Sequence, residues 1–393
     1  SVRSLAEILP REHFPFEGMR ELARQNKPNG FMCVSCAWAK PGEPHPAEFC
    51  EEGAKATAWE LTKLRATPDF FRDHSVTSLR EWRDYDLEQH GRLTHPLRYD
   101  AEADKYVACS WDEAFDAIAA SLRPMDPKRV VFYSSGRTSL EASYMYGLMA
   151  RMYGNQNLPD SSNMCHESTS VGLKAAIGVP VGTTQLKDFD ACDAIFFFGQ
   201  NVGSNSPRML HDLRRGRKWG GGNITFNPLG ERGLGCVTDS ENPIEMATLK
   251  ETGISTQYHQ VKTGGDIAAM MGLAKFLIEW DDAAKAVCDP PVLDHEFIQQ
   301  HTKDFHAFAE KVRASSWEEI ERESGLTRWA LEQAARVYAR SKAVLAIYGM
   351  GLTQHVKGVE NVRMVVNLLL LRGNIGKPGA GPTPVRGHSN VQG

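Results

Sequence analysis

The sequence lacks three features that would each assign it to a recognisable class of protein. No apolar run approaches the ~18–20 residues of a membrane span. Runs such as Ala194–Phe198 and Val365–Leu371 are far shorter than that or are interrupted. Charge of one sign is not in excess: 45 lysines and arginines stand beside 49 aspartates and glutamates, which gives a formal net charge of −4. General binding of DNA or RNA usually needs an excess of basic residues, so we expect no nucleic-acid partner. The short apolar runs lead us to expect no membrane span.

Cysteine is also scarce, since eight in 393 residues are too few for a disulfide scaffold. Three of them crowd between Cys33 and Cys50, which indicates one local metal or redox site and a reducing, cytoplasmic compartment. The chain begins at Ser1, and no signal peptide is visible. With 41% hydrophobic and 24% charged residues, the chain has enough apolar material for a large core, and its length predicts two or three domains.

The first ~110 residues differ from the rest, because they carry a proline-rich stretch, Lys40–Pro46, and few periodic segments. They predict a small α+β domain at 1–110 that depends on a metal. A helix should begin near Ser110, where Ser110–Glu113 has the pattern of a capping box. The region 111–393 should follow as an α/β unit.

Short apolar runs then alternate with segments of helical periodicity, which is typical of parallel sheets of the Rossmann kind. The sequence predicts interleaved Rossmann-like units, with residues 165–340 as a second unit inserted in the first. The closing segment, Gly373–Gly393, is rich in glycine and proline and stops in a loop, so we expect the gene product to continue and a C-terminal cap domain to be absent here. The expected strands are Val130–Ser134, Ala194–Phe198, Ile224–Phe226, Tyr258–Val261 and Val344–Tyr348, and the expected helices are Thr138–Tyr153, Val171–Ile177, Asp266–Ile278 and Gly358–Leu371.

Cys33-x-x-Cys36, followed by Cys50, places soft thiolates at a spacing that suits zinc or an iron–sulfur cluster. A structural zinc site could take His45 as a further ligand. A redox Cys-x-x-Cys is the third alternative, although no βαβ pattern surrounds it. Spacing alone leaves these alternatives open.

A second cysteine, Cys165, directly precedes His166 and a segment of helical character. A thiolate at a helix N-terminus is stabilised by the helix dipole and can act as a nucleophile or as a soft metal ligand. The neighbouring histidine can exchange a proton near neutral pH. The alternative is a buried, inert cysteine beside a hydrogen-bonded histidine.

Two glycine-containing loops follow predicted strands and open helices: Gly199–Arg208 and Lys262–Asp266. Small residues allow backbone N–H groups to approach phosphate, although neither loop is G-x-G-x-x-G or a P-loop. Asp266 could cap its own helix or bind a nucleotide base. Together the loops indicate a large anionic ligand spread over two nucleotide-binding units.

In combination, five segments of the chain resemble the molybdopterin oxidoreductases, and within them the formate dehydrogenase-like alpha subunits of the acid-resistance-associated branch. The resemblance implies two molybdopterin guanine dinucleotides that hold one Mo or W, and a 4Fe-4S cluster nearby. It also implies a small-molecule substrate and a redox partner protein. The segments are Gly30–Trp38, Phe49–Lys55, Asn163–Glu167, Gly349–His355 and Pro384–Gly393.

The resemblance also implies roles for single residues. Cys165 matches the Cys or selenocysteine ligand of the metal, His166 the histidine of proton transfer, Arg386 the arginine that orients formate, and Lys55 the lysine between cluster and pterin. Cys33, Cys36 and Cys50 match cluster ligands, and His388 stands beside Arg386 where formate dehydrogenases have Gln. The residues implied to bind the dinucleotides are Gly136, Arg137, Gly199, Asn201, Asn205, Asn227, Gly264, Asp266 and Gly351.

The implied reaction is a two-electron oxidation or reduction of a small substrate at the metal, with electrons passed through the cluster. Three departures accompany the resemblance: no clear fourth cluster cysteine, His388 in place of Gln, and Asn227 where Asp is more common. Two alternatives therefore remain: the same fold acting on nitrate or on an S- or N-oxide, and a non-catalytic fragment that binds zinc at Cys33 and Cys36.

Overall fold

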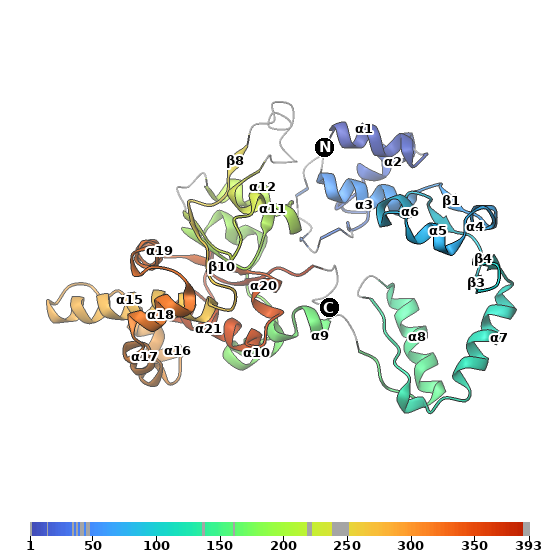
Figure 1. Cartoon of the computed structure of the whole chain (residues 1–393). Helices are drawn as coiled ribbons and strands as arrows, with labels where there is room; N and C mark the ends of the chain where they lie inside the picture. The colour runs from blue at the N-terminus through green and yellow to red at the C-terminus, as the bar shows by residue number, and fades with distance from the viewer. Residues whose placement is uncertain are drawn as a thin grey trace. The chain divides into compact units, whose positions relative to one another are not determined.

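The computed structural model divides the chain into two compact units. Unit 1 comprises Ser1–Ser35 and Pro44–Asp160, and unit 2 comprises Cys36–Glu43 and Ser161–Gly393 (Figure 1). The structure describes residues 2–13, 15–33, 35–36, 38–39, 43–44, 48–135, 138–159, 162–217, 222–237 and 251–387.

Unit 2 is built on a five-stranded parallel sheet in the order β11-β10-β5-β6-β9. Of the five strands of this sheet, the first in sequence, β5, lies in the middle; β6 and β9 extend the sheet on one side, and β10 and β11 extend it on the other. This is the doubly wound order of nucleotide-binding sheets, so the predicted α/β class is confirmed. The strands are β5 (Ala194–Phe198), β6 (Gly222–Phe226), β9 (Gln257–His259), β10 (Val344–Tyr348) and β11 (Gly381–Pro384).

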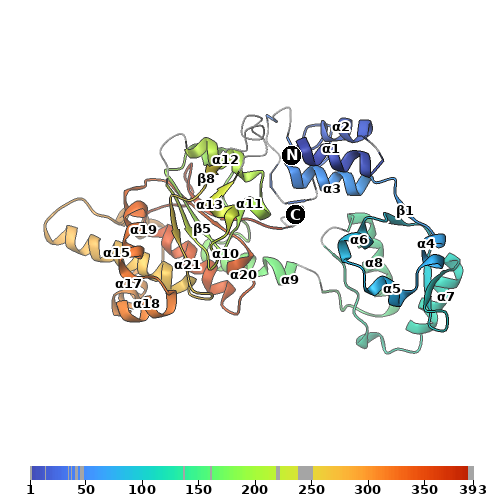
Figure 2. The ribbon, with the colours of Figure 1, turned by 45° about the horizontal axis from the view of Figure 1, so that its top comes forward.

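Helices cover both faces of this sheet because its central strands are apolar on both sides (Figures 1 and 2). In β5, Phe196 and Phe198 pack into a core shared with α15, α19 and α21, whereas Ile195 and Phe197 pack toward α12. The helices are α9 (Ser162–Cys165), α10 (Glu167–Ile177), α11 (Val202–Asn205), α12 (Met209–Arg217), α13 (Arg232–Gly235), α15 (Asp266–Ala286), α16 (His295–His301), α17 (Phe305–Ala314), α18 (Trp317–Ser324), α19 (Arg328–Arg340), α20 (Met350–Thr353) and α21 (Gly358–Leu370), with the 3-10 helix η2 (Leu186–Asp190) and the short pair β7 (Cys236–Val237) and β8 (Thr252–Gly253).

Strand β11 was not expected, because its sequence, Gly381–Pro384, reads as a loop. Proline has no N–H to donate, so it is confined to the edges of sheets. β11 satisfies that condition: among the described strands it lies at the edge of the sheet and pairs with β10, in the register Leu345 to Gly381 and Tyr348 to Pro384. This pairing delivers the residues that follow β11 to the same sheet edge as the residues that follow β10.

Among the residues of unit 1 that the structure describes, the apolar clusters are small. Ile8, Leu9 and Ala58 form one, and Ala66, Phe71 and Leu79 form another. The helices are α1 (Val2–Arg11), α2 (Pro15–Leu22), α3 (Glu51–Leu61), α4 (Pro68–Asp73), α5 (Val76–Arg80), α6 (Asp84–Glu88), α7 (Trp111–Leu122) and α8 (Leu140–Tyr153), with η1 (Pro127–Arg129); the strands are β1 (Arg65–Ala66), β2 (Arg92–Leu93), β3 (Leu97–Asp100) and β4 (Lys105–Ala108).

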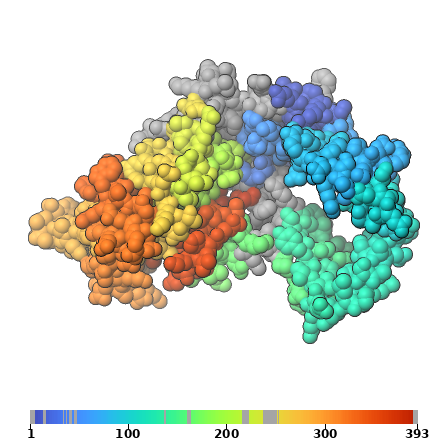
Figure 3. Space-filling view, in the orientation of Figure 1, coloured from blue at the N-terminus to red at the C-terminus, as the bar shows by residue number. Residues whose placement is uncertain are grey.

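Helices α7 and α8 form where the sequence predicts them, but they bury almost nothing. The capping box of Ser110 and Glu113 is present at α7, none of whose residues is buried, and α8 buries only Ala150. The predicted strand Val130–Ser134 is wrong for residues 130–133, which are not in a strand. A strand needs a neighbour to accept its hydrogen bonds, and an apolar run supplies none. The surfaces of α7 and α8 are drawn in cyan and green in Figure 3.

Within the described ranges, no helix combines the length and the apolar character that crossing a bilayer requires.

Candidate active site at the carboxyl edge of the sheet

The loops after β5 and β10 meet at the position where the order of the strands reverses, which is where open α/β sheets bind their ligands. Gly351 donates its N–H to the carbonyl of Gly199 at 3.2 Å. Gly199 has a φ of +56°, and a Cβ there would lie 2.9 Å from the Gly351 Cα. Only glycine allows this approach, so two of the predicted cofactor residues lie together in a backbone cradle without side chains.

Of the other predicted dinucleotide residues, those that the structure describes lie after β5, β6 and β9, at the same edge. Asn201 caps α11 and accepts from the Ser204 N–H, and Asn205 is exposed one turn further on. Asn227 is buried, and its amide donates to the Leu229 carbonyl and to Glu231, each at 2.9 Å. Its side chain therefore braces its own loop.

Gly264 and Asp266 begin α15 opposite His355, which belongs to the loop after β10. Gly264 has a φ of +82°, and a Cβ there would lie 3.0 Å from the His355 Nε2. Asp266 is 6% exposed, and burial raises the pKa of its carboxyl to about 6 although His355 opposes the shift. Asp266 is therefore a buried acid close to its own ionisation point at neutral pH.

Cys165 ends α9, and two residues of α20 contact it. Its thiol is buried and lies 3.4 Å from the Met350 Sδ, to which it donates a weak hydrogen bond. Its carbonyl accepts from the Thr353 hydroxyl at 2.6 Å. Two residues that follow β10 therefore hold the thiol and the backbone carbonyl of Cys165. In sequence, 188 positions separate Cys165 from Thr353.

His166 links Cys165 to the segment after β11. Its Nε2 lies 3.0 Å from the Val385 carbonyl and its Nδ1 2.8 Å from the Thr169 hydroxyl. Because a carbonyl can only accept, Nε2 carries the hydrogen, and the neutral ring then accepts from Thr169 at Nδ1. Burial, together with the charge of Arg386, lowers the pKa of His166 to about 4, so the ring is neutral at pH 7.

Arg386 is buried directly after Val385, and its charge is coupled to Cys165 and Tyr348. Burial lowers the pKa of its guanidinium, because removal from water disfavours the charged form. The structure therefore brings Cys165, His166 and Arg386 close together, and the roles given to them stay predictions.

Three residues of this cluster were missed by the sequence reasoning. Tyr348 ends β10 with its ring centroid 6.3 Å from that of His166, and burial raises the pKa of its hydroxyl, which stays protonated. Met350 and Thr169 contact Cys165 and His166, respectively. Thr169 could have been found, because residues three apart on a helix face each other. Tyr348 could not, because it has the pattern of an ordinary core strand.

The three cysteines of the predicted cluster fall in different units. Cys33 and Cys50 belong to unit 1, and both are buried. Cys36 belongs to unit 2, where it lies in the apolar cluster of Trp38 and Phe189. Among the residues that the structure describes, no three His, Cys, Asp or Glu side chains gather closely enough to hold a metal ion.

Lys55 lies on α3, one turn after Cys50. Its ammonium pairs with Glu51 at 2.8 Å and with Glu52 at 3.3 Å. The hydrogen bond to Glu51 raises the pKa of Lys55, so it is a cation neutralised by its own helix. Its predicted role between cluster and pterin stays a prediction, and the predicted residues Gly136, Arg137 and His388 lie outside the described residues.

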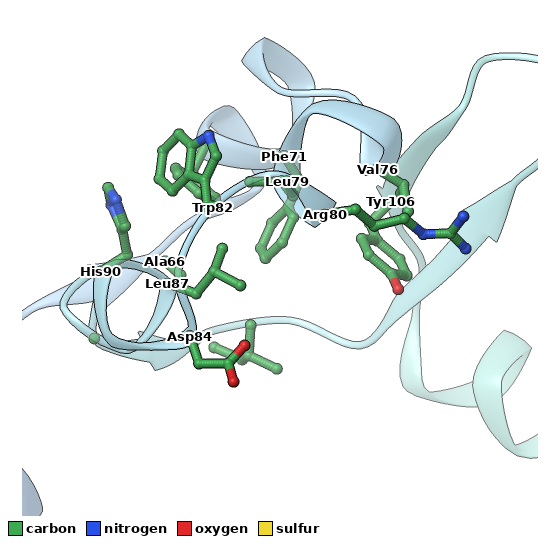
Figure 4. A pocket seen from close by; sticks show the side chains of 13 residues that line it. Ala66, Phe71, Val76, Leu79, Arg80, Trp82, Asp84, Leu87, His90 and Tyr106 are labelled. Carbon is green, nitrogen blue, oxygen red and sulfur yellow. The ribbon is translucent and has the colours of Figure 1, made fainter.

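Unit 1 also contains an open pocket of about 520 Å³. Trp82 and His90 stand on one side of it and Phe71 and Tyr106 on the other, while Arg80 extends its guanidinium away (Figure 4). No residue predicted from the sequence lines this pocket, so its size gives no support to the predicted chemistry.

Comparison with known proteins agrees with the geometry of the sheet. Protein YdeP of Escherichia coli (strain K12) is 49% identical over 394 residues, which cover 100% of this chain and 52% of that protein. Uncharacterized oxidoreductase Rv2900c of Mycobacterium tuberculosis is 41% identical, covering 95% and 47%. The F420-dependent formate dehydrogenase 1 subunit alpha of Methanococcus maripaludis is 30% identical, covering 73% and 39%. The chain thus spans about half the length of the curated relatives it matches.

Among solved structures, acetylene hydratase from Pelobacter acetylenicus shares the fold with a TM-score of 0.56 at 18% identity, covering 88% of this chain and 41% of that one. The family model for molybdopterin oxidoreductases matches residues 92–393, which include the whole parallel sheet and its carboxyl edge. The chain therefore belongs to the molybdopterin oxidoreductase family.

Proposed function

We propose that the protein is a molybdenum- or tungsten-dependent oxidoreductase of the formate dehydrogenase-like kind, acting on a small carboxylate or related oxyanion. The observation that carries the proposal is the convergence of Cys165, His166 and Arg386 at the sheet edge, through the hydrogen bond from His166 to Val385. The similarity to a relative named as a formate dehydrogenase alpha subunit supports formate as the first substrate to test.

The residues at the switch point fit a bis-molybdopterin guanine dinucleotide. Gly199 and Gly351 bring the loops after β5 and β10 into backbone contact at the switch point, and their own N–H groups are donated to the carbonyls of Phe226 and Gly199. Asp266, at the next loop, is a buried acid that suits a guanine base, which offers N–H donors. Bound there, the group would supply the two-electron redox chemistry, while the protein supplies position and field.

In this proposal Cys165 offers its sulfur to the metal from a site that excludes water. Arg386 binds the substrate carboxylate, because a guanidinium can donate two parallel hydrogen bonds to it. His166 has both ring nitrogens bonded to protein groups, so it can exchange a proton with substrate only after the bond to Val385 or to Thr169 opens.

Electrons would leave through an iron–sulfur cluster to a redox partner protein, and Cys33 and Cys50 fit two of its ligands. Both sulfurs are buried and accept backbone hydrogen bonds at 3.4 Å, Cys33 from the Ser35 N–H and Cys50 from the Gly53 N–H. Such N–H groups stabilise metal-bound thiolates. Lys55 is a cation on the helix that follows Cys50, and the role of Cys36, which belongs to unit 2, as a further ligand stays a prediction.

The proposal is tested on the full-length gene product by elemental analysis for Mo, W and Fe and by fluorescence of the released pterin. Turnover is then measured with formate, nitrate and S- and N-oxides, using artificial electron donors and acceptors. Formate oxidation in a molybdenum- and iron-containing protein supports the proposal. Zinc alone, without pterin, contradicts it and favours the non-catalytic alternative.

Cys165→Ala should abolish turnover, because the sulfur is the protein's own ligand to the metal. Cys192→Ala is the matched control: Cys192 is equally buried in unit 2 but precedes β5, at the opposite edge of the sheet. Burial raises the pKa of the Cys192 thiol to about 12, so it is chemically inert. Unchanged turnover in the Cys165 variant would remove this residue from the chemistry.

A further inference from the structure

The segments that carry Cys33 and Cys50 are tied together by two neighbouring amide residues, Gln25 and Asn26. Asn26 accepts from the Cys33 N–H at 2.9 Å and donates to the Glu48 carbonyl at 2.9 Å. One fully buried side chain therefore bridges the two segments. The backbones of the two segments that carry the cysteines are therefore joined through this side chain.

Gln25 differs from Asn26, because only the oxygen of its side-chain amide takes part in a hydrogen bond. It is 0% exposed, and its Oε1 accepts from the Thr57 hydroxyl at 3.0 Å. Its Nε2 is buried and has no hydrogen-bond partner among the residues that the structure describes. A buried donor without a partner costs about 1–3 kcal/mol, so such a group calls for an explanation.

The position of the Nε2 atom supplies that explanation. The point where a Cβ on Gly53 would lie is 2.9 Å from the Gln25 Nε2, 2.9 Å from the Cys33 Sγ and 3.7 Å from the Cys50 Sγ. The donor and the first sulfur are thus separated by no more than twice 2.9 Å. A glycine keeps the space between them clear, and any larger residue at position 53 would have to displace one of these atoms.

We propose that Gln25 is a positioning and tuning residue of an iron–sulfur cluster at Cys33 and Cys50, to which its Nε2 donates an N–H···S hydrogen bond. The inference rests on the cluster in the proposed function and is independent of the substrate. Thr57 holds the oxygen of the amide, because its hydroxyl donates to Oε1, and this leaves the NH₂ group of the same amide for the sulfurs.

The physical consequence concerns the potential of the cluster. Reduction adds one electron, supplied in a titration by dithionite, and increases the negative charge on the sulfurs. Hydrogen bonds to sulfur stabilise that added charge and raise the reduction potential. Removal of the Gln25 donor should therefore shift the midpoint potential to a more negative value without removing the thiolate ligands.

The experiment uses the full-length protein, isolated without oxygen, with iron and sulfide content and an EPR-monitored redox titration as readouts. Gln25→Leu should keep its iron but show a negative shift in midpoint potential. Gln25→Glu keeps the acceptor for Thr57 and replaces the donor by a charge, so it should shift the potential further in the same direction. It also serves as the second variant if the leucine protein does not fold.

Gln89→Leu is the matched control, because Gln89 is another amide in unit 1, at the end of α6, whose side-chain atoms are buried without partners. It should leave the potential unchanged. A cluster whose potential is the same in wild type and in both Gln25 variants overturns the role of Gln25 alone. A wild-type protein that holds no iron–sulfur cluster overturns both this inference and the proposed electron path, so the two failures are distinguishable.

Discussion

Helices α8 and α21 are nearly equal in length and both contain several large apolar residues, yet their surroundings differ completely. Eight of the 13 residues of α21 are buried, whereas α8 buries one of 14. The sheet of unit 2 provides the surface on which α21 packs, and α8 in unit 1 meets no such surface among the described residues. Apolar patterning therefore makes a helix in either unit, but only a matching surface turns the pattern into a core.

The comparison also locates the candidate chemistry. The residues that converge in unit 2 are held by strands that share an edge, so segments far apart in sequence arrive together. In unit 1 the cysteines depend on amide side chains and a helix cap. Substitutions in the two units should therefore change the free energy of unfolding by different amounts and for different reasons.

The largest effect should come from the core of unit 2. Phe198→Ala removes a fully buried ring that stacks on Phe226 with centroids 5.3 Å apart. We expect a loss of about 3–5 kcal/mol in the free energy of unfolding, measured by urea denaturation. Tyr144→Ala on α8, 69% exposed, is the control and should change it by less than about 0.5 kcal/mol. Equal losses would contradict the contrast between the units.

Asp266 should give the next largest effect, and a pH dependence. Its carboxyl has a pKa of about 6 in the fold against 3.8 when unfolded. The folded state therefore binds more protons between about pH 4 and 6, so the free energy of unfolding falls as pH rises through that window. Asp266→Asn should stabilise the protein by about 2–3 kcal/mol above pH 6 and by little below pH 4. Thermal melts at pH 4 and pH 7 measure this, and a pH-independent difference would refute the assignment.

Local capping should matter more where tertiary burial is absent. Ser110→Ala removes the capping box of α7 and should cost about 1 kcal/mol. Native-state hydrogen exchange should then be about five times faster across α7. Thr327→Ala at the cap of α19, which buries five residues, should leave exchange in that helix governed by unfolding of the whole core. Equal acceleration in both helices would remove the distinction.

The smallest change in stability should come from the exposed apolar face of α7, yet it should be visible in association. Trp111, Phe115 and Ile118 are each more than half exposed on that helix. Replacing all three with serine should change the free energy of unfolding by no more than about 1 kcal/mol but reduce binding of a hydrophobic dye and self-association in gel filtration. Unchanged dye binding would show that this face is not the accessible apolar surface.

Much of unit 2 was predictable, and the reason is local. β5 and β10 occur at the predicted residues because each is a buried apolar run, and α10, α15 and α21 follow their periodicity. The run at Val130–Ser134 is also rich in apolar and aromatic residues, yet residues 130–133 are not in a strand, because pairing is not a property of one segment. The opposite error occurred at β11, which is a strand although its sequence predicts a loop. Its glycine and prolines are acceptable in a sheet only at an edge.

The sequence by itself determined the family resemblance, the parallel-sheet class and the kinds of side chain at Cys165, His166 and Arg386. Motifs and periodicity depend only on residues that are close in sequence, so they can be read without the structure. The tertiary structure alone decided that Val385 receives the hydrogen bond of His166, that Gly199 meets Gly351, and that the Gln25 amide is buried beside Cys33. These depend on strand order and on distances through space, which spacing along the chain does not encode.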